Sequence, residues 1–554
     1  FFPRFSSPVW NPSDLLKGVS MATENKQSFL GGAAVLAFGI VAVKIIGAVF
    51  KIPLLNILGE AGSADFSNAY NIYATLLTVS TAGLPVALSK LVSEAYTRGR
   101  TRQAYRTFRV SMAVFLVLGL LSFAVMWWGS AFLAETLNNP RAAYGIRALA
   151  PAVVCVGCLS AFRGYAQGRQ YMTPTAVSQI IEALCKLVFG LALSVWLLKT
   201  TGKDYIAAAG AIAGVTIGTV LSLLYMAVNY LRHRPALRRG EPCAPDGAIL
   251  RRLLALAVPI MLASSMVSII TLIDTKLVQG QLQSALGYTL DETRALYGNY
   301  AACMNLYNLP SSLMVALTAS VIPAVSAAIA QRNGRQTARI VRSSFRVTAL
   351  LAFPMGLGLW SLSDPIFRLF YRRYNAELGG RLLAVLGIAS IFVCLMLITN
   401  SILQAYGRVN LPILTMLLGG VVKIVLNYNL VAIPSVNIHG APIGTLVCFA
   451  LTALLNLIAV SRITHFRLNY PGYFLRPLLA SLAMAFAARG TYALASRFLV
   501  LSSERLTLFV CVFLSIGVAV AVYGALVLAL HCIRRSDLEL LPKGGRIADL
   551  LHIS

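Results

Sequence analysis

The sequence is poor in charged residues. Asp, Glu, Lys and Arg make up only 12% of its 554 residues, whereas soluble domains average about 25%. Acidic residues are especially few, at 19 against 47 Lys and Arg. Because hydrophobic residues reach 58% of the chain, a large water-soluble catalytic domain is excluded, and the composition is typical of an integral membrane protein.

Residues that bind metals or form disulfides are few and scattered. The five His residues lie far from one another and from Cys155 and Cys158, which form a CxxC motif. Most of the nine Cys residues lie in apolar runs, where thiols act as small hydrophobic side chains. We therefore predict no disulfide framework and neither a metal site nor a redox site.

The sequence also lacks a phosphate-binding loop of the form GxxxxGKS or GxxxxGKT, which excludes ATP hydrolysis as its energy source. Any energy that the protein needs would then come from an ion gradient, the membrane potential or a downhill substrate. Na⁺, H⁺ and Cl⁻ are the candidate coupling ions, and no other cofactor is expected.

Fourteen apolar segments lie between residues 29 and 531, and each is long enough for a transmembrane helix of about 20 residues. We therefore predict an all-α integral membrane protein with 14 transmembrane helices. Residues 1–28 are expected to be a disordered cytoplasmic N-terminus, in which 1–20 form an upstream extension before a natural start at Met21. Residues 532–554 are expected to form a cytoplasmic tail.

Most Lys and Arg residues fall near the termini and in the loops that follow even-numbered helices, as in the basic linker 232–252. The positive-inside rule places these loops and both termini in the cytoplasm. This orientation signal accounts for most of the net charge of +28. We therefore expect contact with membrane lipid and no nucleic acid partner.

The two halves of the sequence resemble each other when one is shifted by about 237 residues. Tyr70 then falls on Tyr307, and Lys186 falls on Lys423. Because the shift spans six helices, an even number, the two copies insert with the same orientation. The repeat predicts two parallel six-helix lobes around a central cavity and two appended helices, at residues 29–231, 253–460 and 461–531.

Charged residues inside apolar segments are costly, since a charge at mid-bilayer costs about 2.5–3.5 kcal/mol. Nine such residues lie within or at the ends of the expected spans: Lys44, Arg147, Arg163, Glu182, Lys186, Asp274, Lys276, Lys423 and Arg489. We expect them to line a water-filled cavity, although those near span ends could instead reach the headgroups: Arg147, Arg163, Lys276 and Arg489. Cations outnumber acids, so the cavity is predicted to bind an anion such as phosphate, for which Lys is a suitable partner.

The spacing of the acidic residues predicts their partners. Glu182 and Lys186 have i,i+4 spacing, which favours an ion pair on one helix. Asp274 and Lys276 are two positions apart and point in different directions. We therefore expect Asp274 to meet either a cation from another helix or a coupling ion.

Residues 163–182 read RGYAQGRQYMTPTAVSQIIE. This segment strongly resembles a motif of the stage V sporulation protein B group, which comprises polysaccharide-biosynthesis flippases. That group belongs to the multidrug/oligosaccharidyl-lipid/polysaccharide exporter superfamily. Segments 83–85 (GLP), 307–310 (YNLP) and 320–323 (SVIP) are similar to motifs on helices 2 and 8 of the same superfamily.

The resemblance implies a V-shaped, alternating-access fold that moves undecaprenyl-diphosphate-linked saccharides, such as lipid II, from the inner to the outer leaflet of the bacterial cytoplasmic membrane. Lipid II flippases of this group carry basic residues on helix 1 that face the cavity, and Lys44 matches one such position. Where they have a neighbouring Arg–Asp pair, this chain has Phe50 and Lys51. Lys51 follows Lys44 by seven residues and so shares its helix face.

We therefore expect a monomeric transporter rather than an enzyme, with substrate-binding residues Lys44, Lys51, Arg163, Lys186 and Lys423. The candidates for charge coupling or ion binding are Glu182, Asp274 and Lys276. Two other functions remain open, a cation-coupled multidrug antiporter of the same fold and a non-transporting scaffold for envelope assembly. An exporter of cationic drugs would need carboxylates deep in the first lobe, where only Glu182 qualifies.

Overall fold

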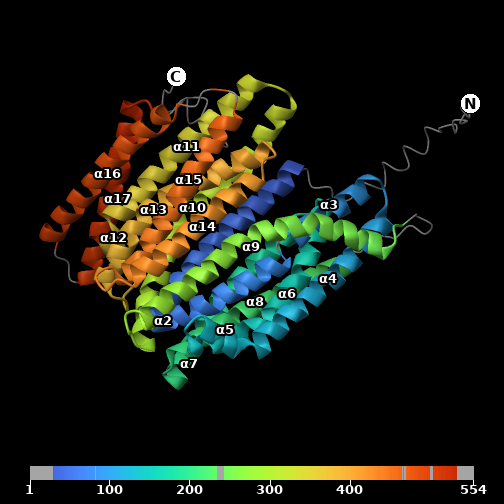
Figure 1. The fold of residues 1–554 in the computed structure, drawn as a ribbon, viewed down its shortest axis with the longest axis horizontal. Coiled ribbons are helices and arrows are strands. Elements are labelled where there is room, and N and C mark those ends of the chain that lie inside the picture. Colours follow the sequence, from blue (N-terminus) through green and yellow to red (C-terminus); the bar gives the residue numbers. More distant parts are fainter. Residues whose placement is uncertain are drawn as a thin grey trace, which may run out of the picture.

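A computed structural model describes residues 29–81, 83–233, 243–464, 466, 469–499 and 503–532. Every regular element in these ranges is helical (Figure 1), which confirms the predicted all-α fold. The predictions for 1–28 lie outside the described residues, as do those for the tail beyond Cys532.

The first lobe consists of α2 to α8. Their bounds are Phe29–Thr81 (α2), Leu84–Thr97 (α3), Thr101–Trp128 (α4), Ser130–Thr136 (α5), Ala143–Gly168 (α6), Thr173–Thr201 (α7) and Asp204–Arg232 (α8), with a 3₁₀ turn η1 at Pro140–Ala142. Its apolar core joins α2 to α6 and α8 through buried side chains such as Leu54, Val153 and Ile212.

The second lobe consists of α9 to α15, followed by two terminal helices. Their bounds are Asp246–Ser284 (α9), Leu290–Ala330 (α10), Gly334–Ser361 (α11), Ser363–Phe370 (α12), Ala376–Ala405 (α13), Asn410–Val431 (α14), Gly440–Ile463 (α15), Tyr470–Phe498 (α16) and Glu504–Ala529 (α17), with a 3₁₀ turn η2 at Asn437–His439. Its main core includes Leu282, Tyr300 and Leu386.

Twelve stretches of the described residues are helical, long and apolar enough to cross a membrane. One of them, Ala42–Thr97, contains the expected span 66–91 and the last part of the expected span 29–50, and α10 corresponds to a further expected span outside the twelve. The chain is thus a multi-pass membrane protein, and the count of 14 stays a prediction.

Helix α2 reverses direction at Gly59, whose backbone is left-handed (φ 67°). Phe50 and Tyr70, on either side of this break, both approach the Lys186 ammonium within about 5 Å, so the two parts of α2 lie side by side. We call the end of the molecule that carries Gly59 the turn end. The opposite end carries Arg98 and Arg252, and we call it the basic end.

Helix α9 contacts both lobes, as its position between them in Figure 1 shows. At the basic end its first turns form ion pairs with the first lobe, Arg252 with Glu94 (2.6 Å) and Asp246 with Arg106. Gly83 is required there, because a Cβ atom at this position would lie 2.2 Å from the Ala257 carbonyl oxygen. The second half of α9 packs instead on α14 and on α2.

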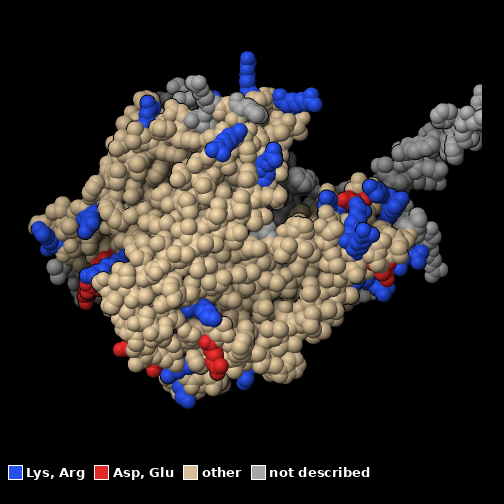
Figure 2. All heavy atoms as spheres, in the orientation of Figure 1, with Lys and Arg blue, Asp and Glu red and all other residues tan. Residues whose placement is uncertain are grey.

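The surface of the molecule carries many exposed apolar side chains, including Trp128, Trp196 and Phe486. Figure 2 shows one face on which charged residues gather toward the ends of the helices and leave a broad uncharged area between them. This distribution fits helices surrounded by lipid, because a continuous apolar surface of this kind would be unfavourable in water.

Candidate functional site

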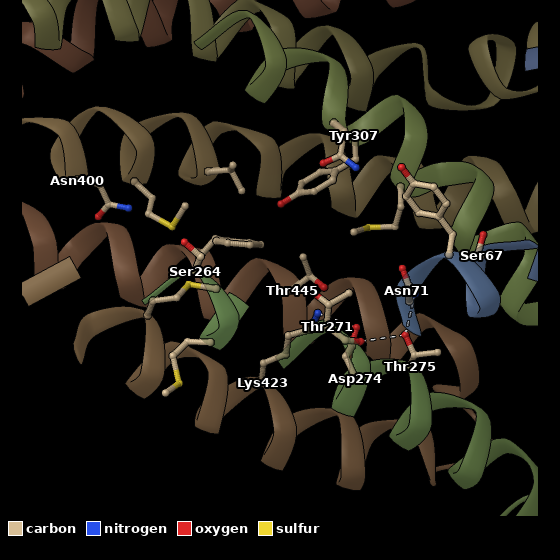
Figure 3. A pocket seen from close by; sticks show the side chains of 18 of the residues that line it. Ser67, Asn71, Ser264, Thr271, Asp274, Thr275, Tyr307, Asn400, Lys423 and Thr445 are labelled. Atoms are coloured by element: carbon tan, nitrogen blue, oxygen red, sulfur yellow. Dashed lines mark hydrogen bonds and ion pairs between the residues drawn. The ribbon is translucent and has the colours of Figure 1, made fainter. Parts of the chain in front are cut away.

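A cavity of about 850 Å³ lies between the lobes (Figure 3). Side chains from α2, α9, α10, α13, α14 and α15 line it, so most of its wall belongs to the second lobe. Its charged lining residues are Lys51, Asp274 and Lys423. The other predicted site residues do not line it: Lys44, Arg163, Glu182, Lys186 and Lys276.

Lys423 and Asp274 form a buried ion pair in the cavity wall. The Lys423 ammonium lies 2.8 Å from one carboxylate oxygen of Asp274, and both side chains are less than 10% exposed. The Asn427 amide donates to the other oxygen. The expectation that Asp274 meets a cation from another helix is therefore confirmed, and a protein ammonium occupies the place considered for a coupling ion.

Lys51 of α2 also lines the cavity and donates a hydrogen bond to Asn305 of the second lobe. Lys186 lies over the Phe50 and Tyr70 rings, with 5.0 and 5.2 Å between its ammonium and the ring centroids. The two cation–π contacts reduce the cost of removing the Lys186 ammonium from water. Tyr70 is itself a lining residue, so Lys186 lies beside the cavity wall.

Two lysines of the predicted site are exposed. Neither Lys44 nor Lys276 lines the cavity. The divergence of Lys276 from the buried Asp274 was predicted from their spacing and is confirmed. Lys186 and Lys423 occupy equivalent positions in the sequence repeat, but their surroundings differ. Lys423 lines the cavity, whereas Lys186 does not.

The predicted ion pair between Glu182 and Lys186 is wrong. Glu182 binds Arg163 of α6 instead, with 2.9 Å between the charged atoms, and Arg163 also donates to Ser178. The guanidinium donates to the hydroxyl and to the carboxylate from two different nitrogens, which hold it in a fixed geometry. Arg163 thereby joins α6 to α7 rather than facing the cavity.

Neutral polar groups make up much of the lining and were missed from the sequence. The polar uncharged lining residues include Ser67, Asn71, Ser264, Thr275, Asn305, Asn308, Asn400, Gln404, Asn410 and Thr445. Amides are uncommon inside apolar spans, because an unpaired amide is costly to bury. The Asn residues within the apolar segments of α13 to α15 were therefore the feature of the sequence that could have indicated a polar cavity.

A second charged cluster joins the lobes at the turn end. The Arg294 guanidinium is 1% exposed and contacts three carboxylates, those of Asp65 and Asp204 in the first lobe and Asp291 on its own helix. Its distances to Asp204 and Asp291 are 2.9 and 2.7 Å. Asn139 donates a further hydrogen bond to Asp65 (2.8 Å).

Hydrogen bonding to Arg294 lowers the pKa of the Asp291 carboxyl, and the nearby charge of Arg141 adds to this effect. Sequence reasoning missed the cluster, because its members lie at span ends and resemble ordinary loop charges.

Other contacts close the turn end between the lobes. Asn68 and Gln279 exchange two hydrogen bonds of 3.0 and 3.1 Å. The Tyr374 hydroxyl donates to the Gly59 carbonyl, and a Cβ at Gly298 would lie 1.9 Å from the Glu60 carbonyl oxygen. Backbone and side chains of the two lobes are therefore in direct contact at this end.

The cavity extends in the other direction toward the basic end. Its lining includes Val409 and Asn410 next to the first turn of α14, and Pro259 in the first half of α9. Figure 2 shows the surface hollowed between the two halves toward this end. The described conformation is thus closed at the turn end and opens toward the basic end. No group of His, Cys, Asp or Glu side chains within the described ranges is arranged to hold a metal ion.

Comparison with known proteins identifies the family. A sequence model described as polysaccharide biosynthesis protein matches residues 29–329, which is more than half of the chain. The chain belongs to the polysaccharide biosynthesis protein family. A second family model, MatE, matches residues 259–429.

Two relatives of this polysaccharide biosynthesis protein are from Bacillus subtilis (strain 168). Lipid II flippase MurJ is 26% identical over 456 residues, covering 78% of this chain and 82% of the relative. Stage V sporulation protein B is 25% identical over 527 residues, covering 94% and 99%. The resemblance to the latter group, and membership of the multidrug/oligosaccharidyl-lipid/polysaccharide exporter superfamily, are therefore confirmed.

Solved structures share the fold of this polysaccharide biosynthesis protein. The inward closed conformation of lipid II flippase MurJ superposes with a TM-score of 0.65 at 14% identity, covering 90% of this chain and 99% of that one. An inward-facing multidrug resistance MATE family transporter gives a TM-score of 0.64 at 15% identity, covering 77% and 98%. These likenesses confirm the two-lobed transporter fold.

Proposed function

We propose that this protein is a flippase that moves an undecaprenyl-diphosphate-linked saccharide, with the peptidoglycan precursor lipid II as its cargo, from the inner to the outer leaflet. The observation that carries the proposal is the charge of the cavity. Two lysines and one aspartate line it, and the aspartate already binds one of those lysines. Lys51 therefore supplies a net positive charge to a site that can receive a diphosphate.

The same observation separates the proposal from a multidrug antiporter of this fold. A cationic drug needs an accessible carboxylate, but both oxygens of Asp274 are occupied by Lys423 and Asn427. Glu182 is likewise bound to Arg163. The similarity to relatives named lipid II flippase MurJ and stage V sporulation protein B adds support.

Transport then follows from the lobes rocking against each other. In the described conformation the cavity extends toward the basic end, which the positive-inside rule places in the cytoplasm. The headgroup enters from the inner leaflet while its lipid tail stays in the bilayer. Separation of the Arg294 contacts at the turn end opens the cavity to the outer face, and no ATP is used.

Rescue of a bacterium depleted of its own lipid II flippase tests this function, with lipid II in the outer leaflet as the readout. We expect the wild-type protein to restore lipid II at the outer face and Lys51→Ala to fail. Lys276→Ala is the matched control, because this lysine is exposed and does not line the cavity. No lipid II at the outer face with a correctly inserted wild-type protein would refute the proposed cargo.

A further inference from the structure

Asn400 of α13 is held in one orientation by a buried hydrogen-bond chain. The Thr415 hydroxyl of α14 lies 2.7 Å from the Asn456 amide oxygen, and the Asn456 amide nitrogen of α15 lies 2.7 Å from the Asn400 oxygen. Asn456 is fully buried and Thr415 is 7% exposed. Three helices thus fix the position of this one lining amide.

The direction of this chain follows from the number of protons available. A Thr hydroxyl has one proton to donate, and its shorter contact is with the Asn456 oxygen rather than the Pro412 carbonyl at 3.2 Å. The Asn456 nitrogen must then donate to the Asn400 oxygen. Among the described residues none is recorded as accepting from the Asn400 nitrogen, which points into the cavity in Figure 3.

Asn400 lies apart from the charged part of the cavity. Figure 3 places it at one end of the view, with Lys423 and Asp274 near the middle and Asn71 toward the other end. Gln404, which follows Asn400 by one helical turn, also lines the cavity. The cavity therefore has a cationic region and, along α13, a region of neutral amide donors and acceptors.

We propose that Asn400 is a specificity-determining residue that donates a hydrogen bond to a hydroxyl or acetamido oxygen of the saccharide in the lipid-linked substrate. This assignment rests on the proposed function. A fixed neutral donor adds little affinity for a diphosphate compared with a lysine, since a neutral hydrogen bond contributes about 1 kcal/mol net. Its effect is discrimination, because a ligand without the matching oxygen leaves the oriented amide unpaired inside the site.

Asn456 acts through Asn400 and is a positioning residue. Without it, the Asn400 amide can rotate and present its oxygen as often as its nitrogen. The affinity difference between substrates with and without sugar should therefore fall when Asn456 is replaced, while affinity for the diphosphate stays the same. A purely structural role for Asn456 would instead lower binding of both lipids together.

The test compares binding of two lipids, lipid II and undecaprenyl diphosphate, to the purified full-length protein in nanodiscs. We expect Asn400→Leu to weaken lipid II binding about fivefold and to leave undecaprenyl diphosphate binding unchanged. Asn456→Leu should reduce the preference for lipid II by a smaller factor. Lys51→Ala should weaken both lipids.

Asn429→Leu is the matched control, because Asn429 is an exposed amide on α14 outside the cavity. It should bind both lipids like the wild type. Equal weakening of both lipids by Asn400→Leu, or no change in either, would overturn the assignment of Asn400. If the wild-type protein bound neither lipid, the proposed function itself would be overturned, and the saccharide role of Asn400 with it.

Discussion

Replacement of Asp65 by Asn should release the contact that holds the lobes together at the turn end. The Asp65 carboxylate accepts two hydrogen bonds from Arg294, and the distance from Arg294 Nε to Asp65 Oδ1 is 3.0 Å. Both side chains are almost fully buried. An Asn side chain has the same shape but places an amide NH₂ against a guanidinium donor. The two lobes then lose the buried ion pair between Asp65 and Arg294.

The size of the effect follows from burial. Removing one partner of a buried ion pair costs about 3–5 kcal/mol. Asp204 and Asp291 remain in contact with Arg294 and are more exposed, so we expect the low end of that range, about 3 kcal/mol. Since each 1.4 kcal/mol is about tenfold in an equilibrium constant, the conformational equilibrium should shift roughly a hundredfold toward opening at the turn end.

Double electron–electron resonance measures this shift. Spin labels at the exposed positions Lys199 and Arg381, in a background with the nine native Cys replaced, report the distance between the lobes. Asp65→Asn should raise the population at longer distances. Asp364→Asn is the control, because its ion pair with Arg368 is exposed and lies within one lobe. An unchanged distance distribution in folded Asp65→Asn protein would show that the cluster does not hold the closed state.

Further variants test the charged residues one by one. Lys423→Ala should abolish transport and lower the thermal unfolding temperature, because it leaves the Asp274 carboxylate buried without its cation. A double variant, Lys423→Met with Asp274→Leu, removes both charges and should recover stability. If it unfolded at the same temperature as Lys423→Ala, this reasoning would be contradicted. Lys186→Ala should abolish transport with membrane insertion intact, because its ammonium lies over the Tyr70 ring of the cavity wall, and full lipid II flipping by this variant would refute a role for Lys186 in the pathway. Arg98→Ala should change little, since loop cations orient the chain collectively, and loss of flipping with orientation preserved would argue otherwise. Single Cys residues at 186 and 423 should change their labelling by impermeant reagents when substrate is added, and a position unreactive from both faces in every state would lie off the pathway.

The predictions from hydropathy and repetition agree with the structure where they concern the backbone. Apolar segments become helices because in lipid each backbone polar group must find a partner within its own segment. The all-α fold and its membrane helices could therefore be predicted. The expected span 66–91 is nevertheless divided between α2 and α3, and Pro85 lies in the first turn of α3, where proline is favoured, whereas in a helix interior it would remove a backbone hydrogen bond.

The predictions for the site were less successful, because ion pairs depend on neighbours distant in sequence. The i,i+4 spacing of Glu182 and Lys186 was visible, whereas the reach of Arg163 from α6 was not. Arg294 and Asp65 are separated by 229 positions and lie at span ends, so their charges carried no sign of burial.

The sequence by itself determined which segments are helical, that they repeat, and which residues carry charge into them. Lys186 and Lys423 occupy equivalent positions in that repeat, but only the tertiary structure decided that Lys423 meets a carboxylate in the cavity wall while Lys186 lies over two aromatic rings. The physical reason is that a repeat preserves the path of the backbone, whereas the stability of a buried charge depends on the side chains that neighbouring helices bring to it.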